Sequence, residues 1–159
     1  DNEISWVDWE LAGENEALLE FTRRLIALRR EHPIFHRTKF LNGQGSPSGL
    51  PDAWWFRPDG RRMTAADWQN AGAHALGVFL NGDEIPDLTA DGRRVVDDSF
   101  LVLLNAGPES IDFRLPAARF GRRWLLELST EDPDAAGVDY QARADVRIES
   151  RSLALLRRA

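Results

Sequence analysis

The sequence predicts a mainly β protein, an antiparallel β-sandwich preceded by one amphipathic helix. Short apolar runs separated by turn-forming residues fill the second half of the chain, at a spacing typical of a sandwich. These runs are Leu76 to Leu80, Phe100 to Leu104, Ile111 to Leu115, Trp124 to Leu128, Val146 to Ile148 and Leu153 to Leu156. The first half instead contains one segment with helical periodicity.

The helix is expected from Asn15 to His32, where Pro33 ends it. Its apolar residues recur at steps of three and four, which places them in one stripe along a helix. The stripe consists of Leu18, Phe21, Leu25 and Leu28. A stripe this apolar needs a partner, so we expect either the β-domain or a second copy of the chain, in a homo-oligomer, to cover it.

A bridge is expected between the helix and the sandwich. Residues 42–51 are rich in Gly, Ser, Pro and Asn and predict a loop. The segment 53–56 predicts a short strand, and the following Arg-Pro-Asp-Gly predicts a turn. Thr64 with Asp67 three residues later resembles a helix cap, so we expect one or two helical turns over residues 65–70.

The strand assignment is clearest at residues 111–115. Ile111, Phe113 and Leu115 alternate there with Asp112 and Arg114. Side chains alternate between the two faces of a strand, so this pattern indicates a strand with one buried and one solvated face.

Composition excludes several classes of function. The formal net charge of −6 disfavours nucleic acid as a partner, because binding phosphates needs clustered basic surface. The chain has no cysteine, which rules out disulfides and thiolate metal sites. No apolar run approaches the roughly 18 residues of a membrane span, and we expect a cytoplasmic protein without a membrane partner.

No self-sufficient catalytic site is expected. The acidic pairs Asp97-Asp98, Asp83-Glu84 and Glu131-Asp132 are adjacent in sequence and are better explained by capping and turns. His32 and His36 have the spacing of a helical metal pair, but Pro33 interrupts the helix between them. No Gly-x-Ser-x-Gly motif or phosphate-binding loop is present. We therefore predict no catalytic residues, no metal and no cofactor in this chain.

The tryptophans are the most distinctive residues, because six of them occur in 159 residues and flat rings stack on sugar faces. Trp54 and Trp55 are adjacent in a predicted strand and should point to opposite faces, with at least one partly exposed. Both are candidate substrate-binding residues. Trp68 and Trp124 are expected in the core. Trp6 and Trp9 could equally line a cleft or pack at the start of the helix.

An ordered series of segments resembles bacterial glycogen debranching enzymes of the isoamylase type, in the α-amylase superfamily. The run Asp1 to Trp9 is similar to the segment that follows the last barrel strand of that family. Residues 19–33 resemble its final barrel helix, with His-Pro at the end. The bridge is matched by Trp55 to Gly60, Met63-Thr64 and Asp67-Trp68, and the C-terminal β-domain by 76–82 and 96–100.

The resemblance implies a β/α barrel with the active site at its C-terminal face, followed by a β-sandwich. Residues 1–40 would then be the end of the catalytic barrel, 41–72 the bridge and 73–159 the C-terminal domain. The implied activity is retaining hydrolysis of α-1,6-glucosidic branch linkages in glycogen or limit dextrin. Its catalytic carboxylates would precede Asp1, so the chain would depend on a missing barrel domain and would be inactive alone.

Two residues of this chain would lie near the glucan in such an enzyme. Asp1 and Asn2 correspond to the loop at the rim of the cleft and are further candidate substrate-binding residues. Two alternatives remain: a non-catalytic glucan-binding module, suggested by Trp54 and Trp55, and another enzyme of the superfamily, such as a transglycosylase or a trehalose-forming relative.

Overall fold

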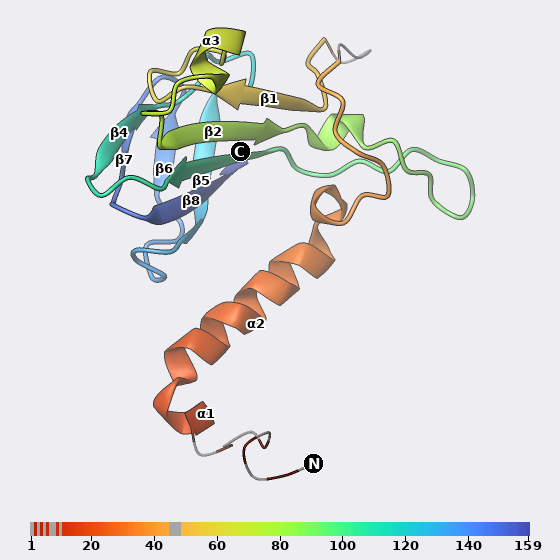
Figure 1. Ribbon diagram of the computed structural model, residues 1–159. Coiled ribbons are helices and arrows are strands. Elements are labelled where there is room, and N and C mark those ends of the chain that lie inside the picture. The colour runs from red at the N-terminus through yellow and green to blue at the C-terminus, as the bar shows by residue number, and fades with distance from the viewer. Residues whose placement is uncertain (1, 3, 5, 7–8, 10, 45–48) are drawn as a thin grey trace.

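The structure is a computed structural model that describes residues 2, 4, 6, 9, 11–44 and 49–159. A helical segment comes first and a β-domain follows (Figure 1). The helices are α1 (Leu11–Glu14), α2 (Glu16–Glu31) and α3 (Ala65–Trp68), with 3-10 turns η2 (Pro33–Phe35) and η3 (Gly82–Glu84). The strands are β1 (Ala53–Phe56), β2 (Ala75–Leu80), β3 (Phe100–Asn105), β4 (Ile111–Arg114), β5 (Arg123–Ser129), β6 (Asp139–Gln141), β7 (Asp145–Ile148) and β8 (Ser152–Arg158).

The β-domain is built from two antiparallel sheets. Six strands form the larger sheet in the order β1-β2-β3-β8-β5-β6, and β4 pairs with β7 in the smaller one. The main core contains residues of both sheets, including Phe79 and Leu101 from the larger sheet and Phe113 and Val146 from the smaller. Trp124 is fully buried in this core. The predicted β-sandwich is therefore confirmed, as is the expected burial of Trp124.

A second apolar cluster covers the opposite face of the larger sheet. Phe100, Leu128 and Leu155 form it together with Ile34 of η2. This face is where the helical segment attaches to the β-domain, because partly buried side chains of α2 also pack against the cluster. The larger sheet thus lies between the small sheet on one side and the end of the helical segment on the other.

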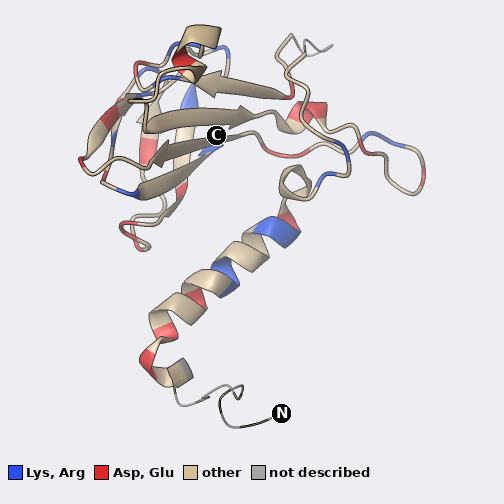
Figure 2. Cartoon of the chain, in the orientation of Figure 1, with Lys and Arg blue, Asp and Glu red and all other residues tan. Residues whose placement is uncertain are grey.

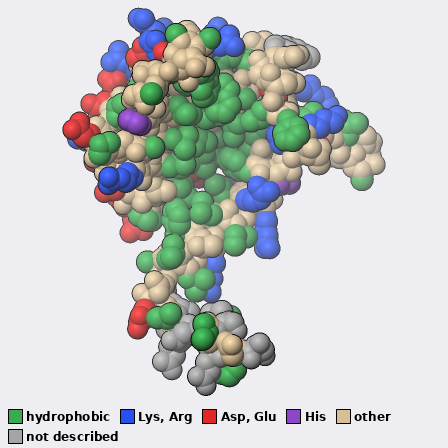
Figure 3. Space-filling view, viewed as in Figure 1, with side chains coloured by type: hydrophobic (Ala, Val, Ile, Leu, Met, Phe, Trp, Pro, Cys, Tyr) green, Lys and Arg blue, Asp and Glu red, His purple; other side chains and the backbone are tan. Residues whose placement is uncertain are grey.

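The helix stripe is only partly covered. Phe21 and Leu28 pack against the second cluster, while Leu18 and Leu25 are 63% and 40% exposed. The space-filling view shows hydrophobic side chains gathered over the sheet and continuing along α2 (Figure 3). The β-domain therefore covers one part of the stripe and leaves another part open. No helix in the described part of the chain is long and apolar enough to span a membrane.

Local sequence signals account for α2 and α3. Basic residues lie in the last turn of α2, as Figure 2 shows in blue, where they complement the negative end of the helix dipole. Thr64 and Asp67 form a reciprocal capping box at α3. The expected boundaries between domains stay a prediction, although β1, assigned to the bridge, pairs with β2 as the edge strand of the larger sheet.

Candidate functional site

Of the four predicted substrate-binding residues, the three that the structure describes do not form one site. Asp1 lies outside the described residues. Asn2 is exposed, and its side-chain oxygen accepts a hydrogen bond from the backbone N–H of Ile4 at 3.1 Å. Trp54 and Trp55 lie on β1, on opposite faces of the larger sheet, as their adjacency predicted.

Trp54 faces the main core. Its ring lies 5.7 Å from that of Phe120, and the Arg62 guanidinium sits over it at 4.2 Å from the ring centroid. The Arg119 guanidinium lies 5.6 Å from the same ring. A cation over an aromatic face is an attractive contact that occupies the surface a sugar would use. The geometry therefore favours Trp55 over Trp54 as a residue available to a ligand.

Trp55 forms an exposed aromatic pair with Trp68 of α3. The ring centroids are 5.6 Å apart and the planes are inclined by 77°, an edge-to-face arrangement. The two residues are 37% and 50% exposed, respectively. The expectation that Trp68 is a core residue is therefore wrong. Its helix is only one turn long and lies next to the edge strand β1 (Figure 1), and Trp68 stays half exposed.

The turn after β1 holds this pair together. Arg57 and Gly60 close the turn with a backbone hydrogen bond of 3.0 Å, and the chain then runs back along β1. The N–H of Met63 donates to the carbonyl of Trp55 at 2.9 Å. This return places the capping box of α3, and hence Trp68, beside Trp55.

Charged groups next to the pair are held in fixed positions. Arg57 contacts Asp59 and also Asp67, the latter at 3.4 Å. Hydrogen bonds from the hydroxyl and the backbone N–H of Thr64 lower the pKa of Asp67, and the hydrogen bond from Arg57 lowers the pKa of Asp59. Both carboxylates are therefore ionised at neutral pH and act only as hydrogen-bond acceptors.

A hollow of about 360 Å³ lies at the turn after β1 and at α3, and its lining includes Arg57, Met63, Asp67 and Asn70 but neither Trp55 nor Trp68. Asn70 accepts a hydrogen bond from the N–H of Gly72 at 3.0 Å, while its side-chain amide donates to no residue in the described part of the chain. The hollow thus combines acceptors and a donor, and it reaches Asp67, the residue before Trp68. We call Trp55, Met63, Asp67, Trp68 and Asn70 the β1–α3 surface.

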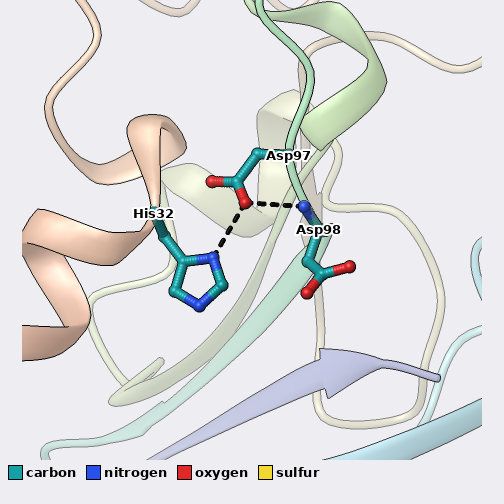
Figure 4. Close-up of side chains that lie close together, drawn as sticks. All are labelled: His32, Asp97 and Asp98. Carbon is teal, nitrogen blue, oxygen red and sulfur yellow. Dashed lines mark hydrogen bonds and ion pairs between the residues drawn. The ribbon is translucent and has the colours of Figure 1, made fainter.

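A second arrangement of functional-type side chains lies between the helical segment and the β-domain. His32 Nδ1 lies 2.8 Å from one oxygen of Asp97, which also accepts the N–H of Asp98 at 2.7 Å (Figure 4). The other oxygen of Asp97 accepts the N–H of Ile34 at 3.0 Å. The ring of His32 packs edge-on against Phe100 at 4.8 Å. We call these residues the His32–Asp97 junction.

The hydrogen bonds of the His32–Asp97 junction give it a structural role. His32, Asp97 and Asp98 have potential ligand atoms within 4.8 Å of one another. Both oxygens of Asp97 are nevertheless used by protein donors, and Asp98 lies 3.2 Å from Arg157. These bonds join the end of α2 to the segment before β3, two parts of the chain that are far apart in sequence.

The other acidic pairs are also placed in structural roles or on the surface. Asp83 pairs with Arg158 at 2.8 Å, and Glu84 lies 3.5 Å from Arg94. Glu131 and Asp132 lie in the exposed loop after β5. None of these described carboxylates forms the isolated, opposed pair that glycoside hydrolysis requires.

Residues 52–156 match the family model described as Isoamylase, C-terminal. The chain is 39% identical to the glycogen operon protein GlgX homolog of Mycobacterium tuberculosis (strain ATCC 25618 / H37Rv), over 99% of this chain and 22% of that protein. It is 26% identical to the isoamylase of Flavobacterium sp, over 87% of this chain and 17% of that protein. The chain therefore spans about a fifth of the length of these curated relatives.

Solved structures show the same fold. Pullulanase type I from Bacillus subtilis str. 168, complexed with maltose, matches with a TM-score of 0.55 and 19% identity, over 96% of this chain and 17% of that one. Pullulanase from Anoxybacillus sp. LM18-11, complexed with maltotetraose, matches with a TM-score of 0.58 and 13% identity, over 99% and 17%. At these identities the likeness concerns the fold alone.

Proposed function

Because the chain belongs to the isoamylase C-terminal domain family, we propose that it forms the C-terminal domain of a cytoplasmic glycogen-debranching enzyme. The enzyme hydrolyses α-1,6-glucosidic linkages in glycogen or limit dextrin. The family match over residues 52–156 is the observation that carries this proposal, and the 39% identity to a glycogen operon protein homolog over nearly the whole chain supports the substrate class.

In this proposal the chain supports catalysis and does not perform it. The catalytic carboxylates belong to a barrel domain that precedes these residues in the full enzyme. The open part of the α2 stripe packs against that barrel, since Leu18 and Leu25 present apolar surface that the β-domain leaves uncovered. The His32–Asp97 junction and the packing of Phe21 and Leu28 fix the direction of α2 relative to the larger sheet.

Incubation with a branched limit dextrin tests the proposal. The full-length natural protein should release linear chains, detected as new reducing ends and separated by chain length, whereas the 159-residue chain should release none. Formation of longer α-1,4 chains or of trehalose-type ends by the full-length protein would identify a transferase or a trehalose-forming relative instead. Hydrolysis by the isolated chain would contradict the assignment of the carboxylates to the barrel.

A further inference from the structure

We propose that the β1–α3 surface is a second glucan-binding site, which holds an α-1,4-linked outer chain of the polysaccharide away from the place of hydrolysis. The inference rests on the proposed function for the class of polysaccharide. The site itself follows from the exposed pair of Trp55 and Trp68 and from the hollow that Asp67 and Asn70 line.

The two rings provide the apolar part of such a site. Sugar rings carry C–H groups on their faces, which pack against aromatic planes, and hydroxyl groups around their edges. Trp55 and Trp68 present two planes inclined by 77°. An α-1,4 chain curves, so its successive glucose units can contact inclined planes, whereas a flat β-1,4 chain fits a coplanar row. The inclined pair therefore favours an α-glucan.

The hollow provides the polar part. A glucose hydroxyl both donates and accepts hydrogen bonds, so it needs acceptors and donors side by side. Asp67 supplies a carboxylate that its Thr64 contacts hold ionised, and Asn70 supplies a side-chain amide. These groups line one hollow of about 360 Å³, and Asp67 directly precedes Trp68 in the chain, so successive units of one glucan chain would contact the hollow and the rings.

The charge of the surface argues for a neutral ligand. Arg57 is shared between Asp59 and Asp67, and Arg61 lies 3.8 Å from Asp59, so the charges around the hollow balance. A phosphate or a nucleic acid would gain little here, because Arg57, the cation that lines the hollow, is already shared between two carboxylates. A neutral polyhydroxyl chain needs no such cation.

The position in the fold keeps this surface accessible. β1 is one edge of the larger sheet. α2 packs toward β5, β8 and β3 through Phe21 and Leu28. Arg24 of α2 also donates to the carbonyls of Glu127 and Pro133. Four strand positions separate β1 from β5, roughly 19 Å at the usual strand spacing. Trp55 pairs with Val78, which pairs with Val102, so Trp55 points to the same face of the larger sheet as α2. The distance along the sheet is therefore what would leave the Trp55–Trp68 edge free of a barrel packed on the open stripe of α2.

Electrophoresis of the 159-residue chain through native gels with and without glycogen tests the proposal. The wild-type chain should be retarded by glycogen. Trp55→Ala and Trp68→Ala should each weaken binding about tenfold, which corresponds to about 1.4 kcal/mol. Maltoheptaose should reverse the retardation, and cellohexaose should not.

Matched variants control for folding and for general exposure of tryptophan. Trp9 is 80% exposed and lies outside the β1–α3 surface, so Trp9→Ala should bind like wild type. Trp55→Phe and Trp68→Phe keep an aromatic plane and should retain most of the binding. Thermal unfolding identifies any Ala variant that has lost its fold. In that case the Phe variants decide whether the aromatic planes bind glucan.

Three results would overturn the inference. They are no retardation of the wild-type chain by glycogen, retardation of Trp55→Ala and Trp68→Ala as strong as that of wild type, or a loss of binding in Trp9→Ala as large as in these two variants. If Trp55→Ala and Trp68→Ala bind glycogen like wild type but make the full-length enzyme less stable, both rings serve packing between domains, and the inference is again overturned. The full-length enzyme with both Trp55→Ala and Trp68→Ala should still hydrolyse short branched oligosaccharides, and its hydrolysis of glycogen should be slower. Glucan binding without any hydrolysis by full-length wild type would refute the proposed function and leave this site standing.

Discussion

Replacing Asp97 with alanine should release α2 from the β-domain more than it weakens the sandwich. The carboxylate accepts from His32 at 2.8 Å and from the N–H groups of Ile34 and Asp98 at 3.0 and 2.7 Å. The side chains of His32 and Asp97 are only 12% and 8% exposed. A buried donor that loses its partner costs about 1–3 kcal/mol, and water can replace some of the lost bonds, so we expect a total loss of about 2–4 kcal/mol.

Urea unfolding followed by circular dichroism measures the loss in free energy of unfolding, and amide hydrogen exchange locates it. Peptides of α2 should exchange at least about tenfold faster in Asp97→Ala, with a smaller change in β3 and β8. Asp97→Asn keeps one acceptor and should lose about half as much. Asp134→Ala, in an exposed loop, is the matched control and should change stability by less than about 0.5 kcal/mol. If Asp97→Ala behaves like this control, or if α2 exchange stays unchanged, the junction does not hold the helix.

Three further changes test other parts of the structure. Asp67 has a pKa lowered below its ordinary value of 3.8, so its capping contribution is full above that value and is lost as the pH falls through the lowered pKa. Indole NMR signals of α3 should shift in that acidic range in wild type and at a higher pH in Thr64→Ala, where Asp67 loses the hydroxyl hydrogen bond that lowers its pKa most. Gly82→Ala would place a methyl group against the carbonyl oxygen of Asp97 and should cost about 3 kcal/mol in urea unfolding. Phe113→Ala, which empties a fully buried position between the sheets, should cost about 3–5 kcal/mol in the same assay, and a loss below about 1 kcal/mol would contradict the assigned core.

Periodic apolar patterns predicted most of the fold. The alternation at Ile111, Phe113 and Leu115 reports burial of one face, and the structure places β4 there. β6 was not predicted, because its Asp-Tyr-Gln sequence has no apolar alternation and the strand depends on pairing with β5. α1 was also missed, since its four residues give too short a pattern for a helical period.

The candidate site was predictable only in part. Adjacency on a strand was enough to predict opposite faces for Trp54 and Trp55. The exposure of Trp68 depends on how the chain returns after residue 60 and sets α3 on the sheet edge, which no local pattern encodes. The His32–Asp97 contact joins residues 65 positions apart, so only the packed fold brings them together.

The claim that this chain braces a larger enzyme is tested most directly by amide hydrogen exchange along α2, in the isolated chain and in the full-length natural protein. Leu18, Leu25 and Ile26 are between 40% and 63% exposed here. If a barrel packs on this face, the amides of residues 18–26 should exchange at least about tenfold more slowly in the full-length protein. Equal exchange in the two proteins would show that α2 has no such partner and would contradict the account.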